Sequence, residues 1–255
     1  MFNFLSGTAI ALIKGANKQT FLYYDVNKKD GYSFFELAQG ESFQLIPSNL
    51  SKGRETLFIA GPTGCGKTKF AVEFMNLYLQ IFQKRDIIIF TPDPNDTSLA
   101  SITDKDRSDI VDINLKDENS GKYRIIQEDV NINDFEKCLV FFDDIAIGED
   151  DSLIKFMDKL RHKVIGVGRH KDVSVITSRH MVTDYRNTRN DLADTKYVVC
   201  FPLGGGRRVL DHYFSKYLML SSELKAQIFS WNADWLVFHQ KFPNFVLSNN
   251  KVLMI

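Results

Sequence analysis

The sequence contains little cysteine and no excess of either charge. Its three cysteines, Cys65, Cys138 and Cys200, are widely spaced and include no C-x-x-C pair. An odd, dispersed set of this kind argues against a disulfide framework or a zinc site and is typical of a reducing compartment. The 32 Lys and Arg residues equal the 32 Asp and Glu residues, so no overall electrostatic field attracts nucleic acid or acidic membranes. Any contact with nucleic acid must therefore be local.

Long hydrophobic runs are also missing. No apolar segment approaches the roughly 18 residues of a membrane-spanning helix. The apolar start of the chain lacks the basic leading region of a signal peptide. We therefore expect neither a signal peptide nor a transmembrane segment. With 255 residues, 44% of them hydrophobic and 25% charged, the composition is typical of a globular protein built on one large α/β domain with additions.

A glycine-rich segment is the most specific feature that is present. The segment GPTGCGKT at residues 61–68 has the G-x-x-x-x-G-K-[ST] spacing of a P-loop. Its three glycines are expected to adopt positive φ angles, which turn successive backbone N–H groups toward phosphates. Lys67 can then reach the β- and γ-phosphates, and the Thr68 hydroxyl can ligate Mg²⁺. The sequence thus predicts binding of ATP and Mg²⁺ by the following residues: Gly61, Pro62, Thr63, Gly64, Cys65, Gly66, Lys67, Thr68 and Lys69.

Short apolar runs alternate with segments whose apolar residues recur at helical spacing. Such runs are typical of buried parallel strands, and the alternation predicts βαβ units. We expect strands at 57–60, 86–91, 138–142, 173–177 and 197–201, and helices at 67–83, 152–165 and 211–229. The predicted fold is an α/β P-loop NTPase with a mostly parallel central sheet flanked by helices.

Both ends of the chain are predicted to add short β segments to this core. Strands are expected at 20–26 and 42–46 before it, at 235–238 and 245–247 after it, and more weakly at 110–113 and 123–126 within it. We predict three regions: a β-rich extension at 1–54, the P-loop ATPase core at 55–205, and a C-terminal helix with short strands packed on the core at 206–255.

Two aspartates follow the apolar strand at 138–142. The P-loop also follows a strand, and ligands of parallel sheets bind at the carboxyl ends of the strands, so these acids are expected beside the nucleotide. Asp143 would hold Mg²⁺ opposite Thr68, usually through water. Asp144 would accept a proton from the attacking water or orient it. Glutamate is the commoner second acid in ATPases, and aspartate is one methylene shorter.

Polar residues after the next strand complete the predicted site. Ser178 follows the strand at 173–177 and can contact the γ-phosphate and report its loss. The segment YRNTRN at residues 185–190 carries Arg186 and Arg189. Either arginine could stabilise the charge on a phosphoryl group bound by a neighbouring subunit, and we favour Arg189. The predicted catalytic set is Lys67, Asp143, Asp144, Ser178 and Arg189.

The ordered combination of motifs resembles one group of enzymes. The segments GPTGCGKT, FFDD at 141–144, GRHKDVSVITSRH at 168–180 and RND at 189–191 are similar to those of the viral genome-packaging ATPases of the FtsK–HerA superfamily. This group occurs in large eukaryotic DNA viruses, virophages and membrane-containing icosahedral viruses. The resemblance covers about residues 55 to 205 and implies a RecA-like or FtsK–HerA-like core. The sequence departs from the group at Arg179, since members usually carry glutamine beside the serine.

The resemblance implies an activity and a set of partners. It implies hydrolysis of ATP coupled to translocation of double-stranded DNA into a preformed viral capsid. The expected assembly is a ring, hexameric by resemblance, with the nucleotide bound between subunits. A capsid vertex or an inner-membrane protein is a further expected partner, and no small-molecule substrate beyond ATP is expected. The implied locations are the host cytoplasm or viral factory and the packaging vertex of the virion.

A local basic cluster offers a contact for DNA. Phosphate contacts suffice for a motor that moves along any sequence. The cluster consists of Lys155, Lys159, Arg161, His162, Lys163, Arg169, His170 and Lys171. We select Lys159, Arg161 and Lys163 as candidate DNA contacts and Arg207 with Arg208 as a second region. The alternative is an ordinary solvated helix face.

The sequence is also consistent with three other functions. A conjugative or cellular DNA pump of the same superfamily is one, although such pumps usually carry membrane segments or DNA-reading domains. A P-loop kinase acting on a nucleotide or small molecule without DNA is another. The two adjacent acids of this sequence, and the long gap between them and the P-loop, are less typical of small kinases. The third is a slow nucleotide-gated switch in assembly.

Overall fold

The computed structural model describes residues 1–15, 19–27, 33–48, 50, 54–182, 188–204 and 207–255, with the backbone alone at 188–190 and 204. Within these ranges no helix is long and apolar enough to cross a membrane. Contacts group the chain into two compact units. Unit one comprises residues 1–52, 60–66 and 180–255, and unit two comprises residues 53–59 and 67–179.

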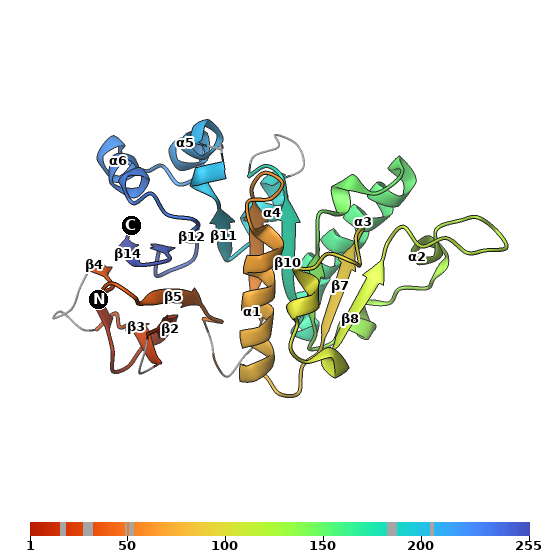
Figure 1. Cartoon of the computed structure of the whole chain (residues 1–255), viewed down its shortest axis with the longest axis horizontal. Helices are drawn as coiled ribbons and strands as arrows, with labels where there is room; N and C mark the ends of the chain where they lie inside the picture. Colours follow the sequence, from red (N-terminus) through yellow and green to blue (C-terminus); the bar gives the residue numbers. More distant parts are fainter. Residues whose placement is uncertain (16–18, 28–32, 49, 51–53, 183–187, 205–206) are drawn as a thin grey trace. The chain divides into compact units, whose positions relative to one another are not determined.

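Unit two is built on parallel strands (Figure 1). The strands follow one another in the order β6 (Thr56–Ala60), β10 (Ser174–Arg179), β9 (Leu139–Phe142), β7 (Ile87–Thr91) and β8 (Ser108–Asp112). β10 with β9, β9 with β7 and β7 with β8 are parallel pairs. The central strands are short and entirely buried, as expected where both faces of a sheet are covered. The predicted mostly parallel α/β core is therefore confirmed.

Helices α1 (Lys67–Ile81) and α3 (Asp151–Val167) cover opposite faces of this sheet. Successive residues of a strand point to opposite faces. On one face of β10, the Ser174 hydroxyl lies 3.1 Å from the Tyr78 hydroxyl of α1. On the other face, Val175 packs in a hydrophobic cluster with the buried side of α3. The two helices therefore contact alternate residues of the same strand.

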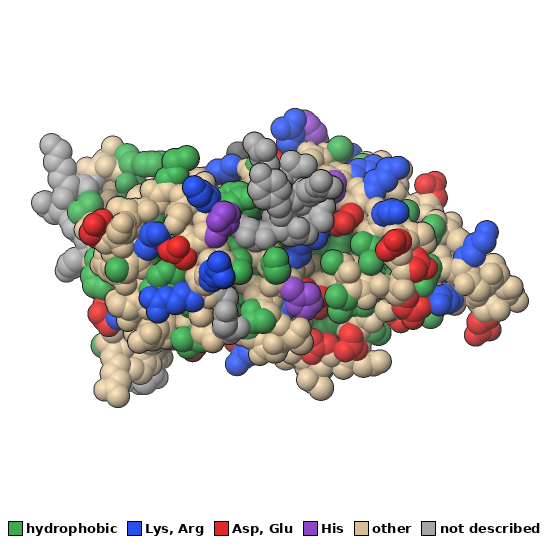
Figure 2. Space-filling model, turned by 90° about the horizontal axis from the view of Figure 1, so that it is seen from above, with side chains coloured by type: hydrophobic (Ala, Val, Ile, Leu, Met, Phe, Trp, Pro, Cys, Tyr) green, Lys and Arg blue, Asp and Glu red, His purple; other side chains and the backbone are tan. Residues whose placement is uncertain are grey.

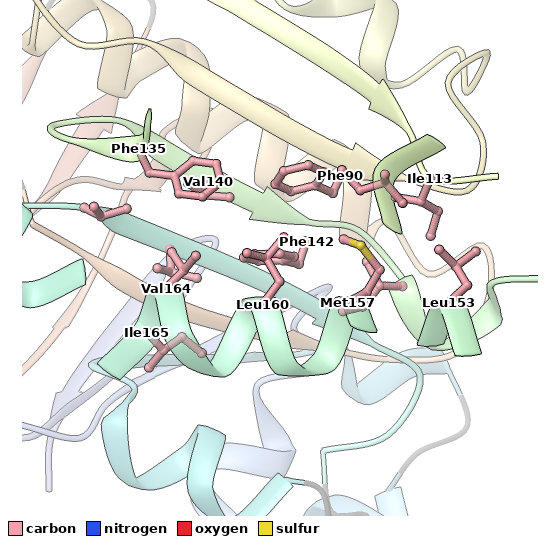
Figure 3. Packing of buried hydrophobic residues seen from close by; sticks show 14 of the residues in the cluster. Phe90, Ile113, Phe135, Val140, Phe142, Leu153, Met157, Leu160, Val164 and Ile165 are labelled. Carbon is pink, nitrogen blue, oxygen red and sulfur yellow. The ribbon is translucent and has the colours of Figure 1, made fainter. Parts of the chain in front are cut away.

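The hydrophobic cluster beneath α3 fixes that helix on the sheet (Figure 3). Leu153, Met157, Leu160 and Val164 recur at helical spacing and point toward the strands. They meet Phe142 of β9, whose ring stacks on that of Phe90 with centroids 5.3 Å apart. Asp150 precedes the helix, and its carboxylate accepts hydrogen bonds from the backbone N–H groups of Ser152 and Leu153 in the first turn.

Unit one contains antiparallel strands. One sheet has the order β1 (Phe2–Asn3), β3 (Thr20–Tyr24), β2 (Thr8–Lys14) and β5 (Ser42–Leu45). A second run of strands has the order β11 (Tyr197–Cys200), β12 (Leu236–His239), β13 (Phe245–Ser248), β14 (Lys251–Met254) and β4 (Phe34–Glu36). The helices of this unit are α4 (Thr188–Asp194), α5 (Arg207–Lys216) and α6 (Ser222–Ser230). The predicted β additions at both ends of the chain are present.

Two predicted elements are wrong. The segment predicted as a strand at 123–126 instead forms the short helix α2 (Arg124–Gln127). The single helix predicted at 211–229 is two helices, α5 and α6. Met219 between them adopts a left-handed φ of 51°, and the Ser221 hydroxyl caps α6 by accepting the Leu224 N–H at 3.3 Å. A serine N-cap and a left-handed residue interrupt the helix although the apolar periodicity continues.

His239 of β12 predicts a pH dependence of stability. The ring is buried between Tyr197 and Phe245, and its Nδ1 lies 2.6 Å from the Pro243 carbonyl oxygen. Because a carbonyl only accepts hydrogen bonds, Nδ1 carries the proton and donates. Burial is the largest cause that lowers the pKa of His239 from 6.5 to about 4, with the positive charges of Lys196 and Lys241 adding to it. The folded protein therefore keeps this imidazole neutral.

Between pH 4 and pH 6.5 the unfolded chain binds a proton at His239 that the folded protein does not bind. Stability from this residue is complete above pH 6.5 and is lost as the pH falls toward 4. The expected loss is about 2–3 kcal/mol, at roughly 1.4 kcal/mol per pKa unit. Denaturant unfolding of the wild type and of His239→Gln across this range measures it, since other titrations cancel in the difference. Parallel stability profiles would contradict the prediction.

Candidate nucleotide-binding site

The glycine-rich segment joins β6 to α1 through a tight turn. Gly64 and Gly66 adopt φ angles of 77° and 104°, a region that disfavours side chains, so any other residue would be strained at these positions. The Cys65 N–H donates to the Pro62 carbonyl oxygen at 3.3 Å and closes the turn. The loop ends at Lys67, the first residue of α1, so the helix N-terminus follows the loop directly.

Gly61 is required for a different reason from the one expected. Its φ is not positive, unlike those of the other two loop glycines. A Cβ at this position would lie 2.6 Å from the Cys65 sulfur and 3.0 Å from the Phe201 ring. Close packing therefore excludes a side chain at Gly61. Phe201, which follows β11 and contacts the loop, was not predicted because no sequence spacing links it to the P-loop.

Lys67 and Asp144 form an ion pair in unit two. The lysine Nζ lies 3.2 Å from the aspartate Oδ2, and the side chains are 5% and 17% exposed. Asp144 comes directly after Asp143 at the end of β9 and has a left-handed backbone with φ 42° and ψ 37°. This conformation is uncommon for a residue other than glycine and turns the chain sharply after the strand. The structure thus brings together a loop lysine and an acid that lie 77 positions apart.

Ser178 joins the two aspartates. Thr177 of β10 pairs with Phe142 of β9, so the next residues in each strand, Ser178 and Asp143, also come together. The Ser178 hydroxyl donates to Asp143 Oδ1 at 2.8 Å and accepts the Asp144 N–H at 2.8 Å. Ser178 is fully buried, and its hydroxyl links the two acids by donating to one and accepting from the backbone of the other. Strand register therefore builds this part of the site.

The Asp143 carboxyl is buried, with 5% of its surface exposed. Burial is the main cause that raises its pKa from 3.8 to about 6. The negative charges of Asp144 and Asp96 raise this pKa further, whereas the Ser178 hydrogen bond and the Lys67 charge lower it. A nearby cation would stabilise the charged form of this carboxylate, because the cation offsets the cost of burying the negative charge.

These residues fit Mg²⁺ as it is bound in nucleotide sites. Magnesium usually takes only one or two carboxylates and completes its coordination with water and phosphate oxygens. In the described part of the chain, no group of three or more His, Cys, Asp or Glu is placed to hold a metal. Asp143 could supply a carboxylate, and half-buried Thr68, in the first turn of α1, could supply a hydroxyl.

The predicted DNA contacts differ in exposure. Lys159 and Lys163 are exposed on α3, as is Lys155. Arg161 is fully buried and pairs with Asp158 at 3.1 Å, so the predicted DNA contact through Arg161 is wrong for this structure. The prediction grouped Arg161 with the lysines because they are close in sequence, but Arg161 lies four residues after Met157, on the buried side of α3.

The remaining basic residues are mostly exposed. His162, Arg169 and His170 are open to solvent, whereas Lys171 lies 3.7 Å from Glu136. Arg207 and Arg208 begin α5 and are exposed, with the Arg207 guanidinium 4.7 Å from the Phe229 ring centre. On the face shown in Figure 2, Lys and Arg side chains lie among Asp and Glu side chains. The view agrees with the balanced charge of the sequence.

The two candidate arginines are less fully placed. The backbone of Arg189 belongs to helix α4, and nothing is described of its side chain. Arg186 lies outside the described residues. The selection of Arg189 as the residue supplied to a neighbouring subunit therefore stays a prediction.

The chain is similar in sequence and in fold to several known proteins. No family model matches the chain. A Sputnik virophage protein named "Uncharacterized protein V3" is 24% identical over 227 residues, covering 88% of this chain and 86% of that protein. The genome packaging NTPase B204 from Sulfolobus turreted icosahedral virus 2, solved with sulfate, superposes with a TM-score of 0.50. Its identity is 13%, with 76% of this chain and 96% of that chain covered.

A second solved structure extends the match. The pCW3 conjugation coupling protein TcpA, in its monomer form with ATPγS, also gives a TM-score of 0.50. It is 13% identical and covers 94% of this chain and 76% of that chain. The chain has a P-loop NTPase fold. These matches support the resemblance inferred from the motifs. One of the proteins that share the fold is a viral genome-packaging NTPase, and a relative in sequence comes from a virophage.

Proposed function

We propose that this P-loop protein is an ATP-driven motor that moves double-stranded DNA into a preformed viral capsid. The proposal of ATP hydrolysis rests on Lys67, Asp143 and Asp144. Lys67 is the cation of the P-loop, and the two acids follow strand β9, with Asp144 next to Lys67. The DNA half draws on the fold matches to a genome packaging NTPase and a conjugation coupling protein. It also draws on the lysines exposed on α3.

The Lys67–Asp144 pair suggests how the site responds to ATP. The lysine Nζ lies 3.2 Å from the acid. The γ-phosphate of ATP would compete with Asp144 for the Lys67 cation. Once Lys67 contacts the phosphate, the Asp144 carboxylate would be free to accept a proton from the attacking water. Bound Mg²⁺ would neutralise charge on the β- and γ-phosphates. Thr68 and Asp143 would hold the metal, and Ser178 would orient Asp143 through its hydrogen bond.

The assembly is proposed as a ring, hexameric by resemblance, around the DNA. In such a ring Arg189 would act on the nucleotide of the adjacent subunit, where an arginine stabilises the transferring phosphoryl group. The three sequence regions at 1–54, 55–205 and 206–255 remain a proposal for how the core and its additions divide. The packaging vertex of the virion and the host cytoplasm or viral factory are the proposed sites of action.

Removing the Ser178 hydroxyl should weaken metal use. Ser178→Ala takes the hydrogen bond from Asp143 Oδ1 and the acceptor from the Asp144 N–H. Groups that orient a metal ligand typically contribute about 10–100-fold to metal affinity or activity. We expect the Mg²⁺ concentration for half-maximal hydrolysis to rise by about that factor. Ser178→Thr, which keeps a hydroxyl, is the control, and an unchanged Mg²⁺ requirement in the alanine variant would contradict the role.

Neutralising two exposed lysines of α3 should weaken DNA binding. Lys159→Gln with Lys163→Gln removes two cations that can contact phosphates, so the slope of log affinity against log salt should become shallower by up to about 2. Lys84→Gln with Lys105→Gln removes two exposed lysines elsewhere and should leave the slope unchanged. Binding titrations with a duplex at several salt concentrations measure it. An unaltered slope in the α3 variant would move the DNA contact to another surface.

Steady-state ATP hydrolysis with and without long double-stranded DNA tests the proposed function. Low salt and micromolar protein favour both DNA contact and assembly. We expect DNA to stimulate hydrolysis, with stimulation rising steeply with protein concentration as subunits assemble. Hydrolysis that ignores DNA but transfers phosphate to a nucleoside or small molecule would favour the kinase instead.

A further inference from the structure

Strand β10 presents two consecutive polar residues to two different helices. Ser178 shares its face with Ser174, which contacts α1, and its hydroxyl holds Asp143. Arg179 is the next residue and points to the opposite face, toward α3. A shift of this strand end of even a fraction of an ångström would therefore move a contact to the metal-site acid and a contact to α3 together.

Asp158 receives Arg179 on the α3 side. One oxygen of this carboxylate, Oδ1, accepts from Arg179 at 2.8 Å and from Arg161 at 3.1 Å. The two arginines are 8% and 0% exposed, whereas Asp158 is 29% exposed. A charge-assisted contact that is this well buried is strong and sensitive to geometry. It is a polar contact between the end of β10 and the middle of α3.

The helix that Asp158 belongs to also carries the exposed lysine row. Lys159 is its immediate neighbour, and Lys155 and Lys163 lie one turn to either side. The buried stripe of α3 packs as one continuous cluster. We therefore expect a displacement at Asp158 to move the helix, with these lysines, as a unit.

We propose that the Arg179–Asp158 pair couples the nucleotide site to α3. Nucleotide binding changes the surroundings of Asp143 and Ser178, the end of β10 responds, and Arg179 transmits the change to Asp158 and the lysine row. Asp158 and Arg179 act here as positioning residues, since neither is assigned a contact with nucleotide or metal. The statement about DNA rests on the proposed function, whereas the movement of α3 does not.

Hydrogen–deuterium exchange of the purified chain, with and without ATPγS and Mg²⁺, tests the movement of α3. In the wild type we expect exchange in residues 151–167 to change on nucleotide binding. In Asp158→Asn and in Arg179→Gln this response should be lost, and the double variant should show no further loss. Asp158→Glu should restore it. Asp151→Asn, two turns earlier on the exposed surface of α3, is the matched control and should respond like the wild type.

DNA affinity in ATPγS and in ADP separates this inference from the proposed function. We expect a difference of at least about fivefold in the wild type, within the usual range of allosteric coupling, and less than twofold in Asp158→Asn. Absence of DNA binding in every state would overturn the proposed function and leave the exchange result to decide the coupling. An Asp158→Asn variant that is less stable but keeps a wild-type exchange response would have lost only a structural contact, and that result overturns the coupling.

Discussion

Lys67→Ala is expected to abolish ATP hydrolysis while leaving the fold intact. Lys67 lies at the N-terminus of α1 with its Nζ 3.2 Å from Asp144, and it is the cation that would meet the γ-phosphate. Removing one preorganised donor to a transition-state anion costs on the order of 10²–10³-fold in rate. Because Lys67 also neutralises Asp144, its loss should leave an acid that repels the phosphate, so we expect the loss to reach the upper part of that range or exceed it.

The measurement is turnover at saturating ATP, together with binding of a fluorescent ATP analogue. Lys84→Ala, an exposed lysine just beyond the end of α1, is the matched control and should keep wild-type turnover. Circular dichroism checks that both variants are folded. Full turnover in Lys67→Ala would show that the P-loop assignment is wrong, since no other residue is assigned the γ-phosphate cation within the chain.

Asp143→Asn is expected to stabilise the nucleotide-free protein and to abolish hydrolysis. Burial raises the pKa of Asp143 from 3.8 to about 6, so at neutral pH the fold holds a carboxylate whose charge it disfavours. Asparagine has almost the same size and can still accept the Ser178 hydrogen bond. At roughly 1.4 kcal/mol per pKa unit the variant should gain about 3 kcal/mol in free energy of unfolding at pH 7.5. Its uncharged amide cannot replace the carboxylate beside Mg²⁺.

The sign of this effect with pH follows from the raised pKa. Between pH 3.8 and pH 6 the folded protein binds a proton at Asp143 that the unfolded chain does not bind. Stability from the protonated carboxyl is therefore complete below pH 3.8 and is lost as the pH rises through 6. The advantage of Asp143→Asn should be full above pH 6 and should vanish near pH 4. Denaturant unfolding in EDTA measures it, with the exposed Asp151→Asn as control. A destabilised Asp143→Asn at pH 7.5 would contradict the account of the site.

The core of the candidate site could be predicted from the sequence because it depends on local spacing and strand order. The P-loop spacing predicts the turn, and Gly64 and Gly66 have the positive φ angles that this turn requires. The apolar run at 138–142 predicts a buried strand, whose carboxyl end brings the acids toward Lys67. The contact between Ser178 and Asp143 then follows from the parallel register of β10 and β9.

Other features depend on side-chain packing that no spacing encodes. Gly61 has no room for a side chain, partly because Phe201, distant in sequence, packs against the loop. Arg161 is an exception, because helical spacing from Met157 places it on the buried side of α3, where it pairs with Asp158. The helix predicted at 211–229 is interrupted where Met219 adopts a left-handed conformation, although the apolar periodicity continues across it. The four-stranded sheet of unit one was only partly predicted, because β1 is very short and β2 lies in an almost uninterrupted apolar run.

ATP-dependent displacement of a third strand from a long duplex tests the central claim most directly. A triplex-forming oligonucleotide at the far end of linear DNA is released only if a motor travels along the duplex. The account predicts release by the wild type with ATP and Mg²⁺, a lag that lengthens with the distance travelled, and no release with ATPγS or by Asp143→Asn. ATP hydrolysis stimulated by DNA without any displacement would show that this chain binds and senses DNA but does not move along it.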